Sequence, residues 1–287
     1  MLLPVRPEVS IVLPTHDRPG PLRTAVESLL KQEPASHFEL IVVDDGESDE
    51  ARSYLEGLAR AGRIVGLRTG GRGAAAARNA GLAAARAPVV ACTDDDCEAP
   101  AGWAQGLSTR LQATGASAVG GRVEAARGTP LAARVSQAIT NGFATVLNRD
   151  PMDAAFLTSN NVAYRADRVR EAGGFDEAFL GKGGEERDLH ARLRARGERL
   201  VYAPDMVVRH RGPLGWAGLV RQQAAYGRGA RLYYARDAAR RPFTPRDYAR
   251  AFRAGLGEMP LLERTAYALG FLLAQGAVAW GYWSRSR

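Results

Sequence analysis

Short apolar runs alternate with helical patterns through the first 94 residues of the chain. Four of these runs are rich in β-branched residues, which is typical of strands covered on both faces of a sheet. The runs are residues 9–14, 39–44, 64–69 and 89–94. The helical patterns lie between them, at residues 20–32, 48–61 and 73–86. Because parallel strands are joined by right-handed crossover helices, this alternation predicts an α/β fold with a mostly parallel central sheet.

The pattern becomes less regular after residue 100. The expected elements are a strand at 117–124, a helix at 130–147, an irregular strand at 156–166, a helix from Glu185 that stops at Gly197, and two short strands within 200–210. From residue 214 onward the pattern is helical. Neither an internal repeat nor a low-complexity linker is visible, so the sequence predicts one large α/β domain with an extension, or two small domains.

Charge is unevenly distributed over the 287 residues. The formal net charge is +8, but residues 209–254 carry eleven arginines and two aspartates, a net +9, so the remainder carries about −1. The basicity therefore belongs to one C-terminal segment, which favours an anionic membrane surface over nucleic acid as a partner. The two cysteines, Cys92 and Cys97, form no disulfide framework, and both are expected to be packing residues in a reducing cytosol. The N-terminal stretch is too short and too interrupted by proline for a signal peptide.

Common nucleotide-binding signatures are missing. The chain has no G-x-G-x-x-G after its first strand, and its glycine-rich stretch GGRGAAAARNAG follows the third. A P-loop lysine is also missing, since the only lysines are Lys31 and Lys182. The sequence therefore excludes a dinucleotide-binding Rossmann domain and a P-loop enzyme.

Acidic residues collect where the predicted strands end. The first strand ends in PTHDR, the second in DDG and the fourth in DDD within CTDDDCE. Ligands of such sheets bind at the carboxyl ends of the strands. Adjacent carboxylates raise one another's pKa unless a cation lies among them, and Mg²⁺ and Mn²⁺ prefer carboxylate oxygen. The sequence thus indicates a divalent-metal site at this edge, with a solvated acidic turn as the alternative.

Seven sequence strings within residues 8–212 together resemble the family 2 glycosyltransferases of GT-A fold. In chain order they are VSIVLPTHDRPGPL, ELIVVDDGESD, GAAAARNAGL, DDDCEAPAGW, GGFDEAF, GGEERDLHARLRARG and VVRH. Each string alone is weak evidence for the family, but the occurrence of all seven in this order makes the resemblance specific. It implies a Rossmann-like GT-A domain at residues 1–212 that binds a nucleotide sugar and carries out catalysis, followed by a helical extension at 213–287.

The resemblance implies a donor site along the strand ends. Asp45 would accept the ring N–H of uracil, His16 would stack on the base, and Arg78 would clamp the diphosphate. The alternatives are that Asp44 and Asp45 cap the following helix, a role that Ser48 can also fill, and that Arg78 is a surface residue. The full set of implied donor-site residues is Pro14, Thr15, His16, Arg18, Asp45, Arg78, Asp94, Asp95 and Asn161.

The same resemblance places Mn²⁺ or Mg²⁺ at the aspartate cluster. Asp96 would bind the metal directly, and Asp94 would bind the donor ribose or the metal's water shell. Because alternate residues leaving a strand share a direction, Asp95 is expected to point back into the protein. His210 would reach the same cation, whereas a lone histidine at a strand end is more often structural. Trp103 matches a tryptophan of the family.

The catalytic base is expected at the start of the helix that begins at Glu185. The family's usual Glu-Asp pair is here Glu185-Glu186, so the base falls on Glu186, with Glu185 as the other candidate. Glutamate is one methylene longer than the usual aspartate. Asp188 is expected to stabilise the helix or to support the base. The glycines of GKGGEE suggest a mobile loop that closes over the donor.

Two interpretations remain open for the C-terminal segment. Its arginines alternate with aromatic residues, which suits either a membrane surface or a helical cap over the active site. Residues 266–283 carry no charge, but their length is at the lower limit for a membrane span and they contain three glycines. Lying on the membrane, pairing with another helix and forming a dimer contact are all compatible with this run.

Together these features predict a metal-dependent, inverting glycosyltransferase. The expected donor is a nucleoside-diphosphate sugar, UDP-linked by preference, and the acceptor is a hydroxyl in bacterial-type glycan, glycolipid or glycoconjugate synthesis. The expected location is the cytoplasm or the inner face of the cell membrane. The rival hypotheses are a retaining GT-A enzyme and a nucleotidyltransferase, which requires a basic glycine-rich loop after the first strand where this chain has PTHDR.

Overall fold

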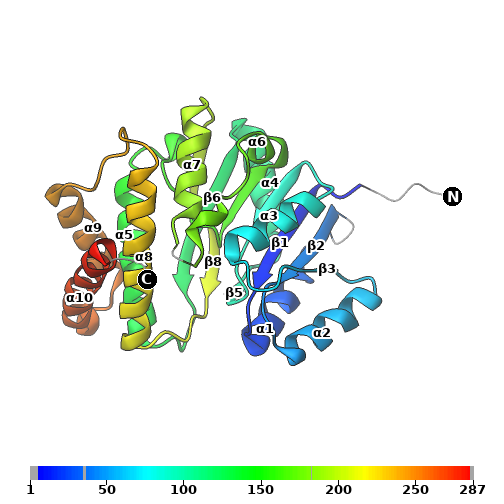
Figure 1. The fold of residues 1–287 in the computed structure, drawn as a ribbon, viewed down its shortest axis with the longest axis horizontal. Coiled ribbons are helices and arrows are strands. Elements are labelled where there is room, and N and C mark those ends of the chain that lie inside the picture. The colour runs from blue at the N-terminus through cyan, green and yellow to red at the C-terminus, as the bar shows by residue number, and fades with distance from the viewer. Residues whose placement is uncertain (1–5, 35–36, 182, 285–287) are drawn as a thin grey trace.

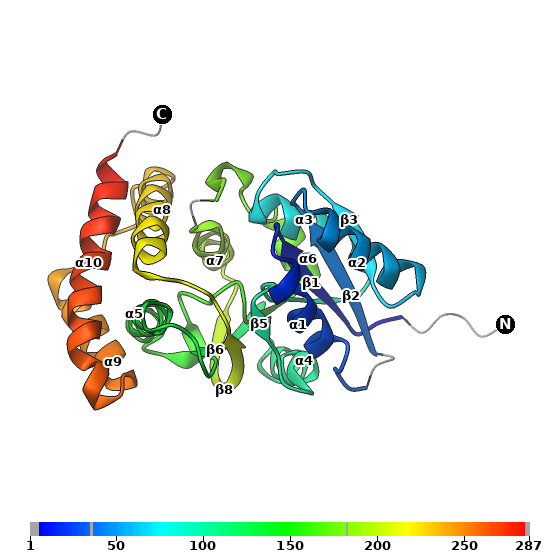
Figure 2. The ribbon, with the colours of Figure 1, turned by 90° about the horizontal axis from the view of Figure 1, so that it is seen from below.

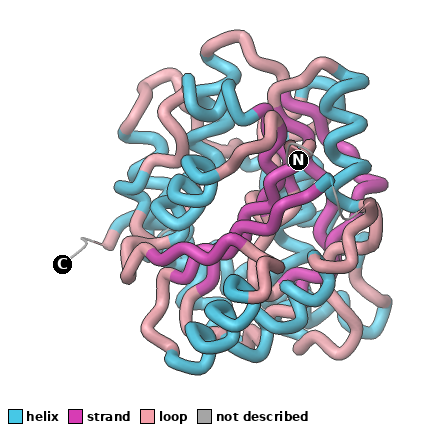
Figure 3. The backbone as a smooth tube through the Cα atoms, turned by 90° about the vertical axis from the view of Figure 1, so that its right-hand side faces the viewer, coloured by secondary structure: helices cyan, strands magenta, loops and turns pink. Residues whose placement is uncertain are grey.

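The fold is built on a mixed, twisted sheet. The computed structural model describes residues 6–34, 37–181 and 183–284, and Figures 1 and 3 show its central sheet. These ranges contain eight strands in the order β3-β2-β1-β4-β7-β6-β8-β5. The strands are β1 (Val9–Thr15), β2 (Phe38–Asp44), β3 (Val65–Arg68), β4 (Val89–Cys92), β5 (Cys97–Glu98), β6 (Ala118–Ala125), β7 (Val162–Arg165) and β8 (Leu200–His210).

The N-terminal half of the sheet is parallel, as the alternating pattern predicts. Strands β3, β2, β1 and β4 run parallel in that order. Their crossover helices are α1 (Pro19–Leu29), α2 (Asp49–Arg60) and α3 (Ala74–Ala84). Successive side chains of β1 face opposite sides, since Ile11 and Leu13 join one core cluster and Val12 joins the other. This double coverage explains why the strands are apolar on both faces.

The second half of the sheet is mixed and corrects two sequence predictions. β7 runs antiparallel between β4 and β6, β8 is parallel to β6, and β5 is antiparallel to β8. The strand expected at 156–166 is confined to β7, because side chains bind the earlier backbone: Asn148 Oδ1 accepts from the N–H groups of residues 155 and 156. The two strands expected within 200–210 are one strand, β8, with a register shift opposite Gly121 and Arg122.

Helices cover both faces of the sheet. α1, α2 and α4 (Trp103–Thr114) pack on one face. α3, α6 (Ala166–Glu171) and α7 (Glu185–Ala195) pack on the other. In Figure 2, α3 and α7 lie on the opposite side of the sheet from α1 and α4. The two cysteines are free and buried, as expected of packing residues.

The C-terminal helices form a separate cluster with α5 (Leu131–Leu147). They are α8 (Trp216–Ala235), α9 (Pro245–Glu258) and α10 (Arg264–Trp283), and Figure 1 shows them beside the sheet. Their shared core includes Val135, Leu219, Tyr267 and Phe271. Short 3₁₀ turns occur at Pro151–Asp153, Glu177–Phe179 and Leu261–Glu263. Within the described ranges, no helix is long and apolar enough to cross a membrane.

One face of α10 packs very closely against α8. A Cβ atom at Gly281 would lie 2.0 Å from the backbone oxygen of Ala224, so only glycine allows this approach. We expect Gly281→Ala to separate the helices and to lower the free energy of unfolding by about 1–3 kcal/mol, the usual cost of overpacking.

Gly276 of the same helix is the matched control for this substitution. It is exposed and has open space around its Cβ position. Gly276→Ala is expected to stabilise the protein by about 0.5–1 kcal/mol, because alanine favours the helix. Thermal unfolding of both variants checks the expectation, and equal melting temperatures would show that α8 and α10 do not touch at Gly281.

Candidate active site

The end of β1 leads into the aspartate cluster. Thr15 Oγ1 donates a 2.7 Å hydrogen bond to Asp95 Oδ2, and Arg18 forms ion pairs with Asp95 and Asp96. Asp95 is fully buried and points into the protein. Burial raises the pKa of Asp95 to about 6, although Arg18 and the bond from Thr15 oppose this effect. Asp95 therefore anchors the loop after β4 and is turned away from ligands.

Asp96 and His210 face one another at the edge of the sheet. Residue 97 pairs with His210 in the β5–β8 ladder, and His210 Nε2 lies 3.2 Å from Asp96 Oδ1. Burial acts to raise the pKa of Asp96, but the hydrogen bond and charge of His210, together with Arg18, lower it to about 2. Burial acts in the opposite direction on His210, whose pKa is nevertheless raised by Asp96. The pairing of β5 with the end of β8 thus brings the Asp96 carboxylate and the His210 imidazole together.

Arg78 connects the aspartate cluster with the start of α7. It is only 4% exposed, and its two terminal nitrogens donate to Asp94 Oδ1 at 2.8 Å and to Glu185 Oε1 at 2.9 Å. Burial opposes the charged form of Arg78, but the two carboxylates outweigh this effect and raise its pKa. The surface position considered for Arg78 is wrong. Both of its terminal nitrogens already bind acids, so the geometry suits linking the two acids better than clamping a diphosphate.

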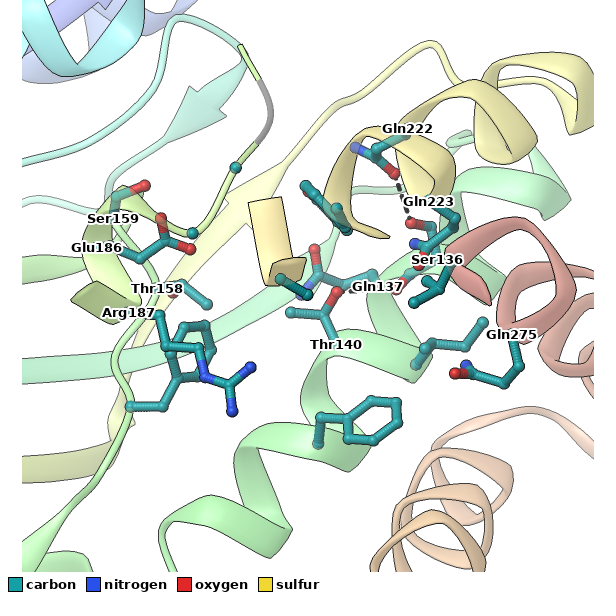
Figure 4. Close-up of a pocket in the computed structure, with 18 of the residues that line it drawn as sticks. Ser136, Gln137, Thr140, Thr158, Ser159, Glu186, Arg187, Gln222, Gln223 and Gln275 are labelled. Carbon is teal, nitrogen blue, oxygen red and sulfur yellow. Dashed lines mark hydrogen bonds between the residues drawn. The ribbon is translucent and has the colours of Figure 1, made fainter. Parts of the chain in front are cut away.

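The two glutamates of α7 have different surroundings. Gly184 precedes the helix with φ at 102°, a conformation that favours glycine. Glu185 turns to Arg78, whereas Glu186 lies at the wall of a large cavity, where Figure 4 labels it. Burial, followed by the neighbouring Glu185 charge, raises the pKa of Glu186 to about 7. Lys182, within the loop expected to be mobile, lies outside the described residues.

Asp45 is occupied by the protein's own backbone. Its carboxylate accepts hydrogen bonds from Thr69 Oγ1 at 2.6 Å and from the N–H groups of Arg72 and Gly73 at 2.8 Å. These bonds hold the loop between β3 and α3, so the structure gives Asp45 a structural role where the resemblance implies a base contact. Ser48 caps α2, which excludes Asp44 and Asp45 as its cap.

The remaining donor-site candidates divide into exposed and buried residues. The His16 side chain is 63% exposed, and its Nδ1 lies 3.0 Å from the Asp45 backbone oxygen. Pro14 is buried in β1 opposite Val43. Asn161 is fully buried: it accepts from Trp103 Nε1 at 2.8 Å and donates to the backbone oxygens of Arg122 and Met206. Its amide belongs to the protein framework, which corrects its placement in the donor site.

A cavity of about 1030 Å³ joins the acidic edge to the C-terminal helices. Arg18, Asp94, Asp96, His210 and Glu186 line one end. Uncharged residues of α5, α8 and α10 line the other, and Figure 4 shows Gln137, Thr140 and Gln275 across the space from Glu186. The size and the mixture of polar and apolar walls are typical of a site for small organic molecules.

The sequence did not reveal which side the aromatic residues of the C-terminal segment face. Six aromatic residues alternate with arginine over residues 226–252. Five of them line the cavity, namely Tyr226, Tyr233, Tyr234, Phe243 and Tyr248. Phe252 packs against Tyr267 and Phe271 instead. Asp188 is bound by Arg192 at 2.7 Å and by Arg240 at 2.8 Å, which ties α7 to the same segment. The interpretation as a cap over the site therefore describes these aromatic residues better than a membrane face.

Metal-binding geometry is incomplete in the part of the chain that the structure describes. No group of three or more His, Cys, Asp or Glu side chains gathers there at ligand spacing. Asp96 and His210 are together, but Asp94 is paired with Arg78. The structure thus brings together two of the three residues expected to bind the metal.

Residues 10–172 match the family described as Glycosyl transferase family 2. The chain belongs to this family. Two curated relatives are similar at 30% identity. The pre-mycofactocin glycosyltransferase of Mycobacterium tuberculosis aligns over 236 residues, 79% of this chain and 47% of that protein. The validoxylamine A glucosyltransferase of Streptomyces hygroscopicus aligns over 220 residues, 67% of this chain and 52% of that protein. The chain therefore spans about half the length of these curated relatives.

Solved structures of other proteins share the fold. A mannosyltransferase from Pyrobaculum calidifontis, solved with GDP-Man and Mn²⁺, superposes with a TM-score of 0.62 at 18% identity and covers 98% of this chain and 77% of its own. S. aureus TarS superposes with a TM-score of 0.57 at 15% identity. The expected α/β GT-A fold with a helical C-terminal region is confirmed.

Proposed function

We propose that the chain transfers a sugar from a nucleoside-diphosphate donor to an acceptor hydroxyl, with inversion at the anomeric carbon and with Mn²⁺ or Mg²⁺ as cofactor. The observation that carries the proposal is the cavity itself. Asp94, Asp96 and His210 line one end of this cavity, and Glu186 lines the adjoining wall. Membership of the family supports the same class of reaction.

Asp96 and His210 fit a divalent cation. Their facing oxygen and nitrogen atoms are ligand types that Mn²⁺ accepts, and a set of two protein ligands suits an ion that completes its coordination with phosphate oxygens and water. Such an ion supplies Lewis-acid stabilisation of charge on the departing diphosphate. Arg18 borders the same cavity, and its two terminal nitrogens are ion-paired with Asp95 and Asp96, so we propose that it holds the aspartate cluster in place.

The position of Glu186 in the cavity wall and its raised pKa support a role as general base. Its carboxylate accepts the proton of the acceptor hydroxyl while the acceptor oxygen bonds to the anomeric carbon. The bond between that carbon and the diphosphate oxygen breaks, and its electron pair leaves with the nucleoside diphosphate. A base with a pKa near the working pH is effective in this role. Arg78 holds Glu185 away from the cavity, so the two glutamates do not compete for the proton.

The donor is proposed to be UDP-linked, and a thermal-shift screen tests it. UDP, GDP, dTDP and CDP sugars are added with and without Mn²⁺. A ligand that binds only the folded state stabilises it by RT ln(1 + [L]/Kd), so the true donor gives the largest metal-dependent rise in melting temperature. A rise with none of the four would refute the donor class, and a larger rise with GDP would replace UDP.

We also expect the protein to bind anionic vesicles through its C-terminal helices. Leu269, Leu272 and Trp280 are exposed along the outer face of α10, and α9 exposes Arg246, Arg250 and Arg253. Exposed apolar and cationic side chains on neighbouring helices match an anionic lipid surface, where each arginine contributes about 1 kcal/mol. Sedimentation with phosphatidylglycerol vesicles is expected at low salt and is expected to weaken as salt rises.

The control for vesicle binding changes charge alone. Replacing Arg246, Arg250 and Arg253 together with glutamine is expected to remove most of the sedimentation without altering the fold, because all three are exposed. Equal sedimentation with phosphatidylcholine and phosphatidylglycerol vesicles, or no loss in the triple variant, would contradict the electrostatic interaction.

A further inference from the structure

Arg187 projects into the cavity beside the proposed base. It follows Glu186 in α7, and Figure 4 shows its guanidinium reaching into the space between α7 and the helices opposite. Glu186 and Arg187 therefore present a carboxylate and a cation to the same cavity. A molecule positioned to lose a proton to Glu186 lies within reach of Arg187.

Aromatic rings hold Arg187 in place. Its guanidinium carbon lies 4.3 Å from the centroid of Tyr233, 5.3 Å from that of Tyr234 and 5.1 Å from that of Phe243. It also donates a 3.2 Å hydrogen bond to Tyr234 Oη. Cation–π contacts fix the orientation of a guanidinium and leave its positive charge in place. We call Arg187 and these three rings the aromatic cage.

Arg187 differs from the nearby Arg240, whose charge is neutralised by an ion pair with Asp188. Arg240 also stacks on Tyr233, with its guanidinium carbon 4.4 Å from the ring centroid, and forms a 2.8 Å ion pair with Asp188. Among residues 6–34, 37–181 and 183–284, Arg187 has no carboxylate within ion-pair distance. A cation fixed by rings, facing a cavity and lacking an acidic partner is suited to bind an anion.

The walls beyond the cage are uncharged. The part of the cavity formed by α5, α8 and α10 is lined by apolar residues such as Phe143, Phe271 and Val278 and by neutral amides such as Gln137 and Gln275. The other charged lining residues lie at the acidic edge or on Glu186. This part of the cavity can therefore hold the apolar portion of a ligand, and the charge at its border is the positive charge of Arg187.

We propose that Arg187 recognises the acceptor, and that the acceptor is amphipathic: an apolar body with a carboxylate or phosphate close to the hydroxyl that receives the sugar. The inference rests on the proposed glycosyl transfer and names the chemistry of its second substrate. Arg187 binds the anionic group, the chamber between α5, α8 and α10 takes the apolar body, and Glu186 receives the hydroxyl proton. Together they orient the hydroxyl for attack.

Matched pairs of small molecules test the inference on the full chain. The carboxylate arm compares 4-hydroxyphenylacetate with its neutral amide, and the phosphate arm compares 2-(4-hydroxyphenyl)ethyl phosphate with 2-(4-hydroxyphenyl)ethanol. Affinity is measured by calorimetry in the presence of UDP and Mn²⁺. In at least one arm the wild-type protein is expected to bind the charged member about 10-fold more tightly, as a charge-assisted bond provides. The arm that shows the preference identifies the anionic group.

Three variants distinguish recognition from a structural role. Arg187→Gln is expected to abolish the preference for the charged member while the neutral member binds as before, and Arg187→Lys is expected to retain part of it. Arg240→Gln removes the other arginine that stacks on Tyr233 and is expected to keep the full preference. If Arg187→Gln weakens both members of a pair equally, or if neither anion is preferred by the wild-type protein, the inference is wrong.

A nucleotide measurement separates this inference from the proposed function. Metal-dependent stabilisation by UDP, or by the nucleotide that replaces it, is expected to be unchanged in Arg187→Gln, because in the described part of the chain Arg187 bonds to neither Asp96 nor His210. Nucleotide binding without anion preference would refute the acceptor chemistry alone. Absence of binding by all four nucleotides would refute the proposed glycosyl transfer.

Discussion

Replacing Glu186 with glutamine is expected to lower kcat by about 10²–10⁴, the usual contribution of a general base, while donor affinity stays near the wild-type value. Glutamine keeps the size of the side chain but cannot accept the proton. The measurement is steady-state turnover with the donor found in the nucleotide screen. Near-normal turnover in this variant would show that α7 does not supply the base.

The pH profile gives a second test of the same residue. Because the pKa of Glu186 is about 7, the carboxyl is protonated at lower pH and cannot accept a proton. Turnover by the wild-type enzyme is therefore expected to rise with pH up to about 7 and then to level off, with a tenfold change per pH unit on the acidic limb. The residual activity of Glu186→Gln is expected to lack this limb.

Glu185→Gln is the internal control for Glu186. Glu185 is bound by Arg78 and turned from the cavity, so its loss weakens a buried ion pair without removing the base. We expect a lower melting temperature and a smaller loss of turnover than in Glu186→Gln. A dead Glu185→Gln enzyme with an active Glu186→Gln enzyme would move the base by one residue.

Replacing Asp96 with alanine is expected to abolish the metal-dependent part of nucleotide binding. At a nucleotide concentration of about 100 Kd, binding stabilises the folded wild-type protein by about 2.7 kcal/mol, and the part that requires Mn²⁺ is expected to disappear in the variant. The loss follows from removing the carboxylate that faces His210. Thermal unfolding with UDP, with and without Mn²⁺, measures it.

Glu98→Ala provides the matched control for Asp96. Glu98 lies two residues further along the chain in β5 and is paired with Arg211 at 2.6 Å, and it does not line the cavity. The metal-dependent shift is expected to persist in Glu98→Ala. An unchanged shift in Asp96→Ala would remove Asp96 from the metal site.

The sequence predicted the parallel half of the fold well because each of its elements is encoded locally. Runs of β-branched residues and the helices between them determine β1 to β4 without distant information. The mixed half depends on pairings between distant segments, such as β5 with the end of β8. The strand expected at 156–166 is shorter in the structure because Asn148 Oδ1 accepts hydrogen bonds from the N–H groups of residues 155 and 156. No periodic pattern in the sequence signals such bonds.

The candidate active site could be predicted only in part, again because the sequence reveals local features better than contacts between distant segments. Side chains leaving a strand alternate in direction, so the inward turn of Asp95 followed from spacing alone. Arg78 lies on a helix in which seven of eleven residues are alanine, so no clear polar face indicates which side is buried. The alternation of arginine with Tyr233, Tyr234 and Phe243 fits a membrane face as well as a cavity wall, so only the folded chain distinguishes them.

The wall built by α8 and α10 has a consequence for how this enzyme can diversify. At the acidic edge, Asp94 and Asp96 lie between β4 and β5 and His210 ends β8, whereas much of the opposite wall comes from residues 216–283, outside the segment that matches the family. Substitutions in those two helices can remodel one half of the cavity and leave the aspartate cluster untouched. Natural selection, or a laboratory exchange of this segment between relatives, can therefore alter the proposed acceptor end of the cavity independently of the proposed donor end.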